Sequence, residues 1–301
     1  MVRAWWPTLV GYGLDAAFGE RLLPSHPVAY AGTALGALEK WCYRDRRSAG
    51  MWYVLGGLSL AEVATRLVPS RLVATYVSVA HTMLLSESKA VEDHLVAGEL
   101  DDARSRLRSL VGRDAALLDE AGISRAVIES VAENTVDAVV APLFWGALFG
   151  ARGTYWYRMI NTMDSQVGYR NERFRRFGTA AARLDDVANY LPARLVVVLV
   201  MVVRPRKIGR VIDAVRRDAP QHPSPNAGVA EASFAGALGV TLGGTNTYGG
   251  VSEPRGNLGV GPAPTASQIA EARRLSRRVG LAALVGLVLF ERYVVRRWGA
   301  R

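Results

Sequence analysis

The chain alternates apolar stretches with polar, arginine-rich ones. Six apolar stretches are candidates for membrane helices, and we expect about five membrane-embedded segments among them. The stretches begin near Ala4, Met51 and Leu72 or cover residues 137–152, 191–203 and 279–295. None contains about 20 uninterrupted apolar residues, the usual mark of a membrane-spanning helix. The longest charge-free runs, residues 72–86 and 138–151, are short enough to be core helices of a soluble protein instead.

The residues that flank these stretches favour a membrane. Basic clusters lie at 44–47, 204–207 and 296–297, and aromatic residues lie near the ends of the stretches: Trp5, Trp6, Trp52, Tyr53, Trp156 and Tyr157. Both features are typical of segments at a membrane surface. We therefore expect an all-α fold, a multi-pass membrane helical bundle that forms one domain over residues 1–301 in the cell membrane.

Long polar segments separate the apolar ones. Residues 86–123 combine leucines with many charges, which predicts an amphipathic helical region. Residues 205–225 are basic and lead into a proline-rich loop, and residues 242–264 are so rich in Gly, Asn and Pro that we expect an irregular loop. No strand pattern of useful length is evident, so we expect these loops to face the cytoplasm and carry the function.

The charge balance narrows the choice of partners. Half of the 301 residues are hydrophobic, 21% are charged, and the formal net charge is +10. Excess arginine favours anionic ligands or an anionic lipid surface. No zinc-finger, RNP or basic-zipper pattern is present, so we expect no nucleic-acid partner. The single Cys42 excludes an intramolecular disulfide and a cysteine metal site.

Three carboxylates are spaced four residues apart where a polar segment enters an apolar one. Glu129, Glu133 and Asp137 would share one helical face, where like charges repel one another. Such a face needs a compensating cation. The sequence favours a divalent cation, and the alternative is a solvated face neutralised by Arg125 or other arginines.

Two further segments have the composition of a phosphate or metal site. In residues 161–178, basic side chains alternate with aromatic and hydrogen-bonding ones, which suits phosphate or carboxylate oxygens but also a cytoplasmic anchor beside the membrane. Further on, Asp185 or Asp186 shares a helical face with Asn189. Hard oxygen ligands of this kind suit Mg²⁺ bound together with phosphates.

The histidines fall into two classes. His26 and His222 each precede a proline in a loop, where either could accept a proton or donate a hydrogen bond to phosphate. His81 lies in an apolar run and is expected to be a packing residue. Ala232 and Gly236 are small residues four apart, which predicts a close helix contact. No common nucleotide-binding loop or hydrolase motif is present.

Several of these segments resemble one known family. The chain contains SVAENTVD at 130–137, APLFW at 141–145, INTMDSQVGYRNER at 160–173, ARLDD at 182–186, RDAP at 217–220 and HPSPNAG at 222–228. In this order, and with GLD at 13–15 and HPV at 26–28, they resemble the adenosylcobinamide-phosphate synthase (CobD/CbiB) family over nearly the whole chain.

The resemblance implies a membrane protein of cobalamin biosynthesis. The implied reaction joins aminopropanol or aminopropanol phosphate to the corrinoid adenosylcobyric acid, with ATP as co-substrate and Mg²⁺ as cofactor. We expect the corrinoid carboxylate to pass through an acyl phosphate. Membrane lipid is a further expected partner, and the sequence also allows a homo-oligomer.

The site residues follow from residue type and spacing. The candidate Mg²⁺ ligands are Glu129, Glu133, Asp137, Asp185 and Asp186. The candidate catalytic residues are Glu133, Asp137 and His222, with His222 taking the ammonium proton. The candidate substrate- and phosphate-binding residues are His26, Asn134, Arg170, Asn171, Arg173, Arg183 and Asn226.

Two other functions fit parts of the pattern. An intramembrane prenyltransferase also binds Mg²⁺-diphosphate on acidic helices, but it would use an isoprenoid and no ATP. A corrinoid carrier or regulator would bind without turnover. The number of carboxylates and arginines argues against a passive role, because charges at membrane depth are costly.

Overall fold

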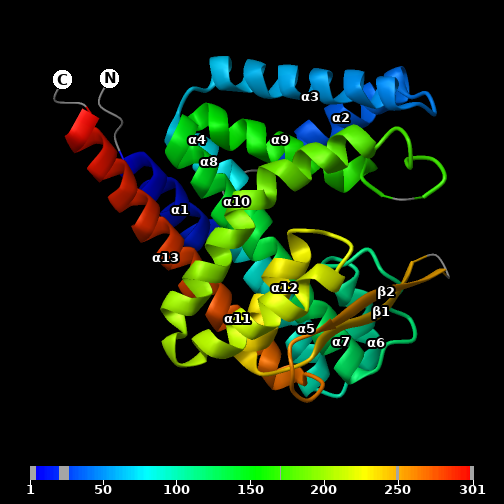
Figure 1. The fold of residues 1–301 in the computed structure, drawn as a ribbon. Coiled ribbons are helices and arrows are strands. Elements are labelled where there is room, and N and C mark those ends of the chain that lie inside the picture. Colours follow the sequence, from blue (N-terminus) through cyan, green and yellow to red (C-terminus); the bar gives the residue numbers. More distant parts are fainter. Residues whose placement is uncertain (1–4, 20–26, 170, 249–250, 299–301) are drawn as a thin grey trace. The chain divides into compact units, whose positions relative to one another are not determined.

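The computed structural model describes residues 5–19, 27–169, 171–248 and 251–298, and they are nearly all helical, as predicted (Figure 1). The chain forms two compact units. The first comprises residues 1–80, 137–189 and 284–301, and the second comprises residues 81–136 and 190–283. The expectation of a single domain over residues 1–301 stays a prediction.

The first unit is built from packed helices. It contains α1 (Trp6–Phe18), α2 (Pro27–Cys42), α3 (Arg47–Leu67), α4 (Arg71–Ser78), α8 (Ala141–Phe149), α9 (Ala151–Val167) and parts of α10 (Thr179–Val203) and α13 (Ala266–Trp298). Helix α9 packs against both α3 and α8. Helices α3 and α9 approach so closely at Gly57 that any larger residue there would clash with the sulfur of Met163. Tyr53, Tyr157 and Phe177 are fully buried in this unit.

A π-helical turn, η2 (Val136–Val140), precedes α8 and carries Asp137. Pro142 has no backbone N–H, so it leaves the carbonyl of Ala138 without its normal helical donor. That carbonyl accepts a hydrogen bond from the backbone N–H of Ala80 at 3.1 Å instead. Asp137 therefore lies in a helical segment whose regular hydrogen bonding is interrupted, a feature common near functional sites.

The second unit contains the remaining helices and a hairpin. Its elements are α5 (His81–Val96), α6 (Leu100–Leu107), α7 (Glu120–Thr135), η3 (Pro205–Lys207), α11 (Ile208–Arg217), η4 (Ala219–Gln221), α12 (Ala227–Leu238), β1 (Leu242–Tyr248), β2 (Val251–Leu258) and the other parts of α10 and α13. The predicted helix contact at Ala232 and Gly236 is confirmed. Ala232 is fully buried, and a Cβ at Gly236 would lie 2.6 Å from the carbonyl oxygen of Arg210. His81 is buried and hydrogen-bonded to Ser276 at 3.1 Å, as expected of a packing residue.

The expectation of an irregular loop over residues 242–264 was wrong for its first part. Strands β1 and β2 pair antiparallel with Leu242 opposite Leu258, and the register shifts between Gly243 and Thr245. Gly243 has a φ of 77°, and a Cβ there would lie 2.1 Å from the carbonyl oxygen of Gly256. Glycines thus permit the bulge, and the same glycines hide the strand pattern in the sequence.

The predicted membrane segments are only partly reproduced as long helices. The apolar run 72–86 is divided between α4 and α5, and the run 138–151 is divided at Gly150, whose φ is 68°. Within the described ranges, one helix, Thr179–Val203, is long and apolar enough to cross a membrane.

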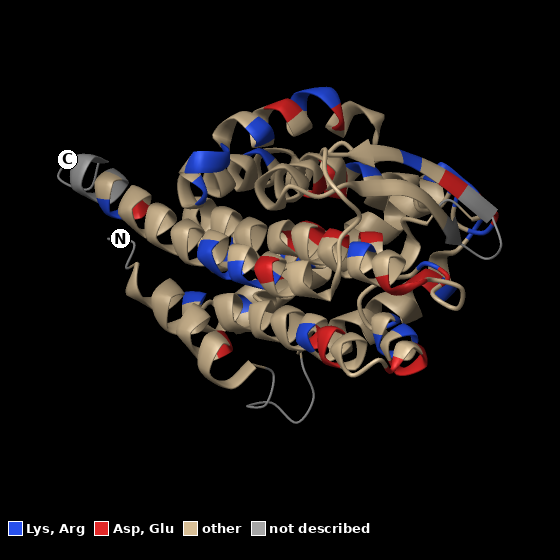
Figure 2. Ribbon diagram, turned by 90° about the horizontal axis from the view of Figure 1, so that it is seen from below, with Lys and Arg blue, Asp and Glu red and all other residues tan. Residues whose placement is uncertain are grey.

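Many large apolar side chains are nevertheless exposed. The ribbon is mostly uncharged (Figure 2), and on three helices large apolar side chains are more than half exposed: Met51, Trp52, Leu55 and Val63 on α3; Val187, Leu191 and Val202 on α10; and Val285, Leu289 and Tyr293 on α13. Exposed apolar faces of this kind mark binding or membrane surfaces.

Candidate functional site

The first unit brings two predicted metal ligands together. The Nδ2 of Asn161 on α9 donates to Asp137 Oδ2 at 3.0 Å and approaches Asp185 Oδ1 at 3.5 Å. On α10, Asn189 Nδ2 donates to Asp185 Oδ2 at 2.9 Å, which confirms that these two residues share a helical face. Tyr157 donates to Asn189 Oδ1 at 2.8 Å. We call these five residues the Asp137–Asp185 cluster.

The residues of the Asp137–Asp185 cluster differ in how far they are buried. Asn189 and Tyr157 are buried, whereas Asp137, Asn161 and Asp185 are partly exposed. The amides and the tyrosine therefore hold two partly exposed carboxylates in place. Asp186, the next residue on α10, is also partly exposed.

The donor set of this cluster fits Mg²⁺. Mg²⁺ typically takes one or two protein carboxylates and completes its octahedron with water and substrate phosphates. Asp137 and Asp185 provide two carboxylates on either side of one amide group. In the described part of the chain, one group of three side chains has ligand atoms close enough together to bind a metal ion by themselves. It consists of His94, Glu99 and Asp102 and is largely exposed.

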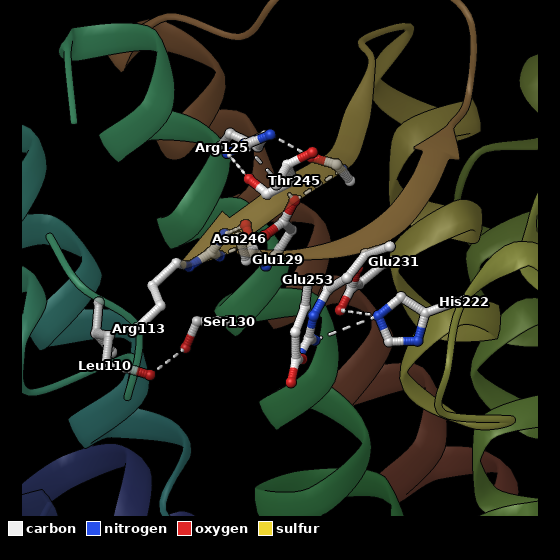
Figure 3. Close-up of polar contacts among 12 residues, drawn as sticks. Leu110, Arg113, Arg125, Glu129, Ser130, His222, Glu231, Thr245, Asn246 and Glu253 are labelled. Atoms are coloured by element: carbon white, nitrogen blue, oxygen red, sulfur yellow. Dashed lines mark hydrogen bonds and ion pairs between the residues drawn. The ribbon is translucent and has the colours of Figure 1, made fainter. Parts of the chain in front are cut away.

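The second unit contains a buried ion pair at Glu129. Arg113 donates to Glu129 Oε2 and also to Asn246 on β1, and the side chains of Arg113 and Glu129 are 6% and 5% exposed (Figure 3). Glu129 Oε1 accepts from the backbone N–H of Gly243 at 2.7 Å, at the hairpin bulge. The sequence favoured a divalent cation as the partner of Glu129, with arginine as the alternative. In the structure the partner is Arg113, and the Nε of Arg125 lies 4.0 Å from Glu129 Oε1.

Beside this ion pair lies a second group: Glu133, His222, Glu231 and Arg255, which we call the Glu231 cluster. Figure 3 shows the His222 ring directed toward Glu231, with 3.9 Å between Nε2 and Glu231 Oε1. Arg255 Nη1 lies 3.4 Å from the same Nε2. On the other side of the ring, the backbone N–H of Ser224 donates to Nδ1 at 3.1 Å, and the carbonyl oxygen of Ser224 lies 3.2 Å from the same nitrogen.

Burial shifts the pKa values in the Glu231 cluster. Loss of hydration, reinforced by the charges of Glu129 and Glu133, raises the pKa of Glu231 well above its ordinary value. Loss of hydration also raises the pKa of Glu133, although the residue is exposed on the surface of α7. Burial and then Arg255 lower the pKa of His222, which is therefore neutral at pH 7.

The remaining predicted residues lie outside both clusters. Arg173 is paired with Glu39 at 2.8 Å and stacks on Tyr43, and Asn171 accepts from the backbone N–H of Phe174 at 2.9 Å. Arg183 is exposed.

Two predicted asparagines are hydrogen-bonded to other residues of the protein, and two further predicted residues are not among the described ones. Asn134 donates to the carbonyl oxygen of Ser130 at 2.9 Å, and Asn226 accepts from Arg194 at 2.7 Å. His26 and Arg170 lie outside the described residues.

Sequence reasoning missed several members of these clusters: Arg113, Tyr157, Asn161, Glu231 and Arg255. Glu231 had a detectable signal, because it is the one charged residue in α12, a 12-residue helix of otherwise small and apolar residues plus one serine. An isolated carboxylate in such a segment is costly unless it has a role. Arg113 and Arg255 had no comparable signal, because arginine is common throughout the chain.

Comparison with known proteins gives a consistent result. Residues 8–276 match the family model described as CobD/Cbib protein. The chain is 43% identical to the cobalamin biosynthesis protein CobD of Mycobacterium tuberculosis (strain H37Rv), covering 97% of this chain and 99% of that protein. It is 41% identical to CobD of Chromobacterium violaceum (91% and 86% covered) and 37% identical to CobD of Rhodobacter capsulatus (93% and 96% covered). No solved structure matches the chain.

Proposed function

Because the chain belongs to the CobD/CbiB family, we propose that it is a ligase of cobalamin biosynthesis. It joins (R)-1-amino-2-propanol, or its O-2-phosphate, to the propionate carboxylate of adenosylcobyric acid at the expense of ATP. The observation that carries this proposal is the Asp137–Asp185 cluster, since paired, positioned and partly exposed carboxylates are what a Mg²⁺–phosphate site requires.

The reaction has two parts. The corrinoid carboxylate attacks the γ-phosphorus of ATP, and ADP leaves, which produces an acyl phosphate. The amine nitrogen then attacks the carbonyl carbon, a C–N bond forms, and the C–O bond to phosphate breaks. Mg²⁺ held by Asp137, Asp185 and Asp186 would offset charge on the phosphates.

Glu129 has a structural role in this proposal. Both of its carboxylate oxygens already have strong donors, one from Arg113 and one from the backbone N–H of Gly243. Removing Glu129 from Arg113 to bind a metal would leave a buried guanidinium without its partner, which is expensive. Glu133 and His222 remain the candidates for proton transfer in the second unit.

We further propose that the protein is embedded in the cell membrane by several segments. Support comes from the α10 helix and from the exposed apolar residues of α3 and α13, which would contact lipid. Arginine-rich segments 44–47 and 204–207 follow α2 and α10 and would lie at the cytoplasmic surface.

ATP turnover by the purified, detergent-solubilised protein tests the function. We expect ADP release only when adenosylcobyric acid and the amine are both present with Mg²⁺. Conversion of an isoprenoid diphosphate without ATP would instead indicate the prenyltransferase. Bound corrinoid with no ADP release would indicate a carrier.

A further inference from the structure

Basic residues gather on the first unit, where the connection between α2 and α3 meets the turn between α9 and α10. Residues 39–47 and 171–176 contain seven lysines and arginines but three carboxylates. We call these two segments together the basic surface. All seven basic residues are exposed. Both segments lie at the end of α3 where that helix begins (Figure 1), so their positive charges are concentrated in one place.

Contacts between the two segments of the basic surface hold them together. The hydroxyl of Tyr43 donates to the carbonyl oxygen of Arg173 at 2.9 Å, and the Tyr43 ring lies 5.3 Å from the ring of Phe177, centroid to centroid. Phe177 is fully buried, and any residue larger than glycine at Gly50, in the first turn of α3, would clash with its carbonyl oxygen. The arginines of both segments therefore stand on one packed framework.

The carboxylates of the basic surface neutralise only part of its charge. Arg173 is paired with Glu39 at 2.8 Å, and Arg176 lies 3.7 Å from Asp45. The other five basic residues have no carboxylate within ion-pair distance among the residues that the structure describes. Several unpaired cations on one surface create a positive potential that attracts anions. The basic surface is therefore suited to an anionic partner.

Exposed tryptophans and an apolar helix face adjoin the basic surface. Trp41 lies within it, Trp52 lies in the second turn of α3, and they are 79% and 67% exposed. Met51 and Leu55 continue the exposed apolar face along α3. Indole rings favour the boundary between lipid headgroups and acyl chains, and apolar side chains favour the chains themselves. A soluble anion would use the arginines alone, whereas a phospholipid would use both the arginines and the apolar face.

We propose that the basic surface binds the headgroups of anionic phospholipids, with Trp41 and Trp52 at the level of the headgroups. This inference rests on the proposed membrane location and deepens it by naming the class of lipid. Arg46 and Arg175, one from each segment, are exposed and unpaired in the described structure, so they contact the lipid phosphates. Guanidinium groups suit this role because they bind phosphate oxygens with two parallel hydrogen bonds.

Quenching of tryptophan fluorescence by brominated lipids tests this surface. The full-length protein is reconstituted into phosphatidylcholine vesicles that contain a minor fraction of phosphatidylglycerol with brominated acyl chains. Brominated phosphatidylcholine at the same mole fraction is the comparison. We expect stronger quenching by the phosphatidylglycerol, because the arginines concentrate it beside Trp41 and Trp52. The Trp41→Phe/Trp52→Phe variant should remove this difference, since the difference arises at these two rings.

Substitutions of the unpaired arginines test the charge. Arg46→Gln/Arg175→Gln should lower the local enrichment of phosphatidylglycerol by at least ~5-fold, the effect of a single arginine at an anionic lipid surface. Arg46→Lys/Arg175→Lys keeps both charges and should retain most of the enrichment. The matched control is Arg210→Gln/Arg216→Gln, which removes two exposed charges from α11. It should leave the difference between the two lipids unchanged.

Failure of the headgroup site and failure of the membrane location have different results. Equal quenching by the two brominated lipids, an unchanged difference in Arg46→Gln/Arg175→Gln, or an equal loss in the α11 control would overturn the headgroup site and leave the membrane location intact. If neither lipid quenched Trp41 or Trp52, the location of this surface at the bilayer would be wrong as well. Displacement of the phosphatidylglycerol by ATP would identify a nucleotide site instead. The ligation is tested separately, by the corrinoid product.

Discussion

Two buried glutamates, Glu129 and Glu231, differ in what surrounds them. Both are at most 4% exposed, yet Glu129 has an arginine and a backbone N–H as partners, whereas Glu231 has neither. A buried carboxylate with partners on both oxygens contributes to the fold. In one without them, loss of hydration favours the neutral acid, which raises the pKa of Glu231. At the scale of single residues, hydrogen-bond partners thus distinguish the two glutamates.

The Glu129→Gln substitution should lower stability. It leaves Arg113 as a buried, uncompensated charge, and breaking a buried pair in this way costs about 3–5 kcal/mol. We expect this loss in the free energy of unfolding, measured by denaturant titration in detergent. Glu133→Gln, which breaks no ion pair in the described structure, is the control and should change stability by less than ~1 kcal/mol. Equal losses in the two variants would contradict the structural role of Glu129.

The pKa of His222 predicts a pH dependence of stability. Burial lowers this pKa in the folded protein below its ordinary value of 6.5. Below pH 6.5 the unfolded chain therefore gains a proton at this position that the folded protein does not, so stability falls as the pH falls, down to the folded pKa. Between pH 7.5 and pH 5, the Tm of the wild type should therefore fall by more than the Tm of His222→Gln. A constant difference would show that His222 titrates normally.

At the scale of elements, glycine and proline positions decide where helices come close or end. Pro142 and the carbonyl of Ala138 account for the π-helical turn at Asp137, and Gly236 allows α12 to approach α11. Since α12 carries Glu231 and α7 carries Glu133, the close packing of α12 against both α7 and α11 places the Glu231 cluster.

The contact between α11 and α12 can be tested with a pair of alanine substitutions. In Gly236→Ala the new Cβ would lie 2.6 Å from a backbone oxygen of α11, so the helices must separate at a cost of about 1–3 kcal/mol. Gly209→Ala, in α11 with no atom within 4 Å of the new Cβ, should instead stabilise the protein by about 0.5–1 kcal/mol. Opposite changes in Tm are expected, and a gain for Gly236→Ala would contradict the packing.

The elements also show what could be predicted from sequence. Helical spacing correctly placed Asp185 and Asn189 on one face, because that relation is local. Contacts such as Asn161 with Asp137, or Arg113 with Glu129, join distant segments and depend on packing that spacing does not determine. The hairpin was missed because glycines with positive φ build its bulge and interrupt the strand pattern.

At the scale of the whole molecule, large apolar side chains remain exposed outside the buried core. Those on α3, α10 and α13 are the basis of the proposed membrane location. We expect the protein to stay in the membrane fraction after washes with high salt and with alkaline carbonate. Release by salt alone would show that its basic residues, and not its apolar faces, hold it there.

The most direct test of the central claim is the mass of the corrinoid product. With Mg-ATP, amine and ¹⁸O-carboxylate-labelled adenosylcobyric acid, the wild type should form a corrinoid heavier by the amine less water. One ¹⁸O should appear in the released phosphate, because the acyl phosphate loses its bridging oxygen. Asp185→Asn should lower kcat by about 100-fold or more through the loss of charge stabilisation at the phosphates, while Asp213→Asn, an exposed control on α11, should not. Product without ATP, phosphate without label, or full activity in Asp185→Asn would contradict the account.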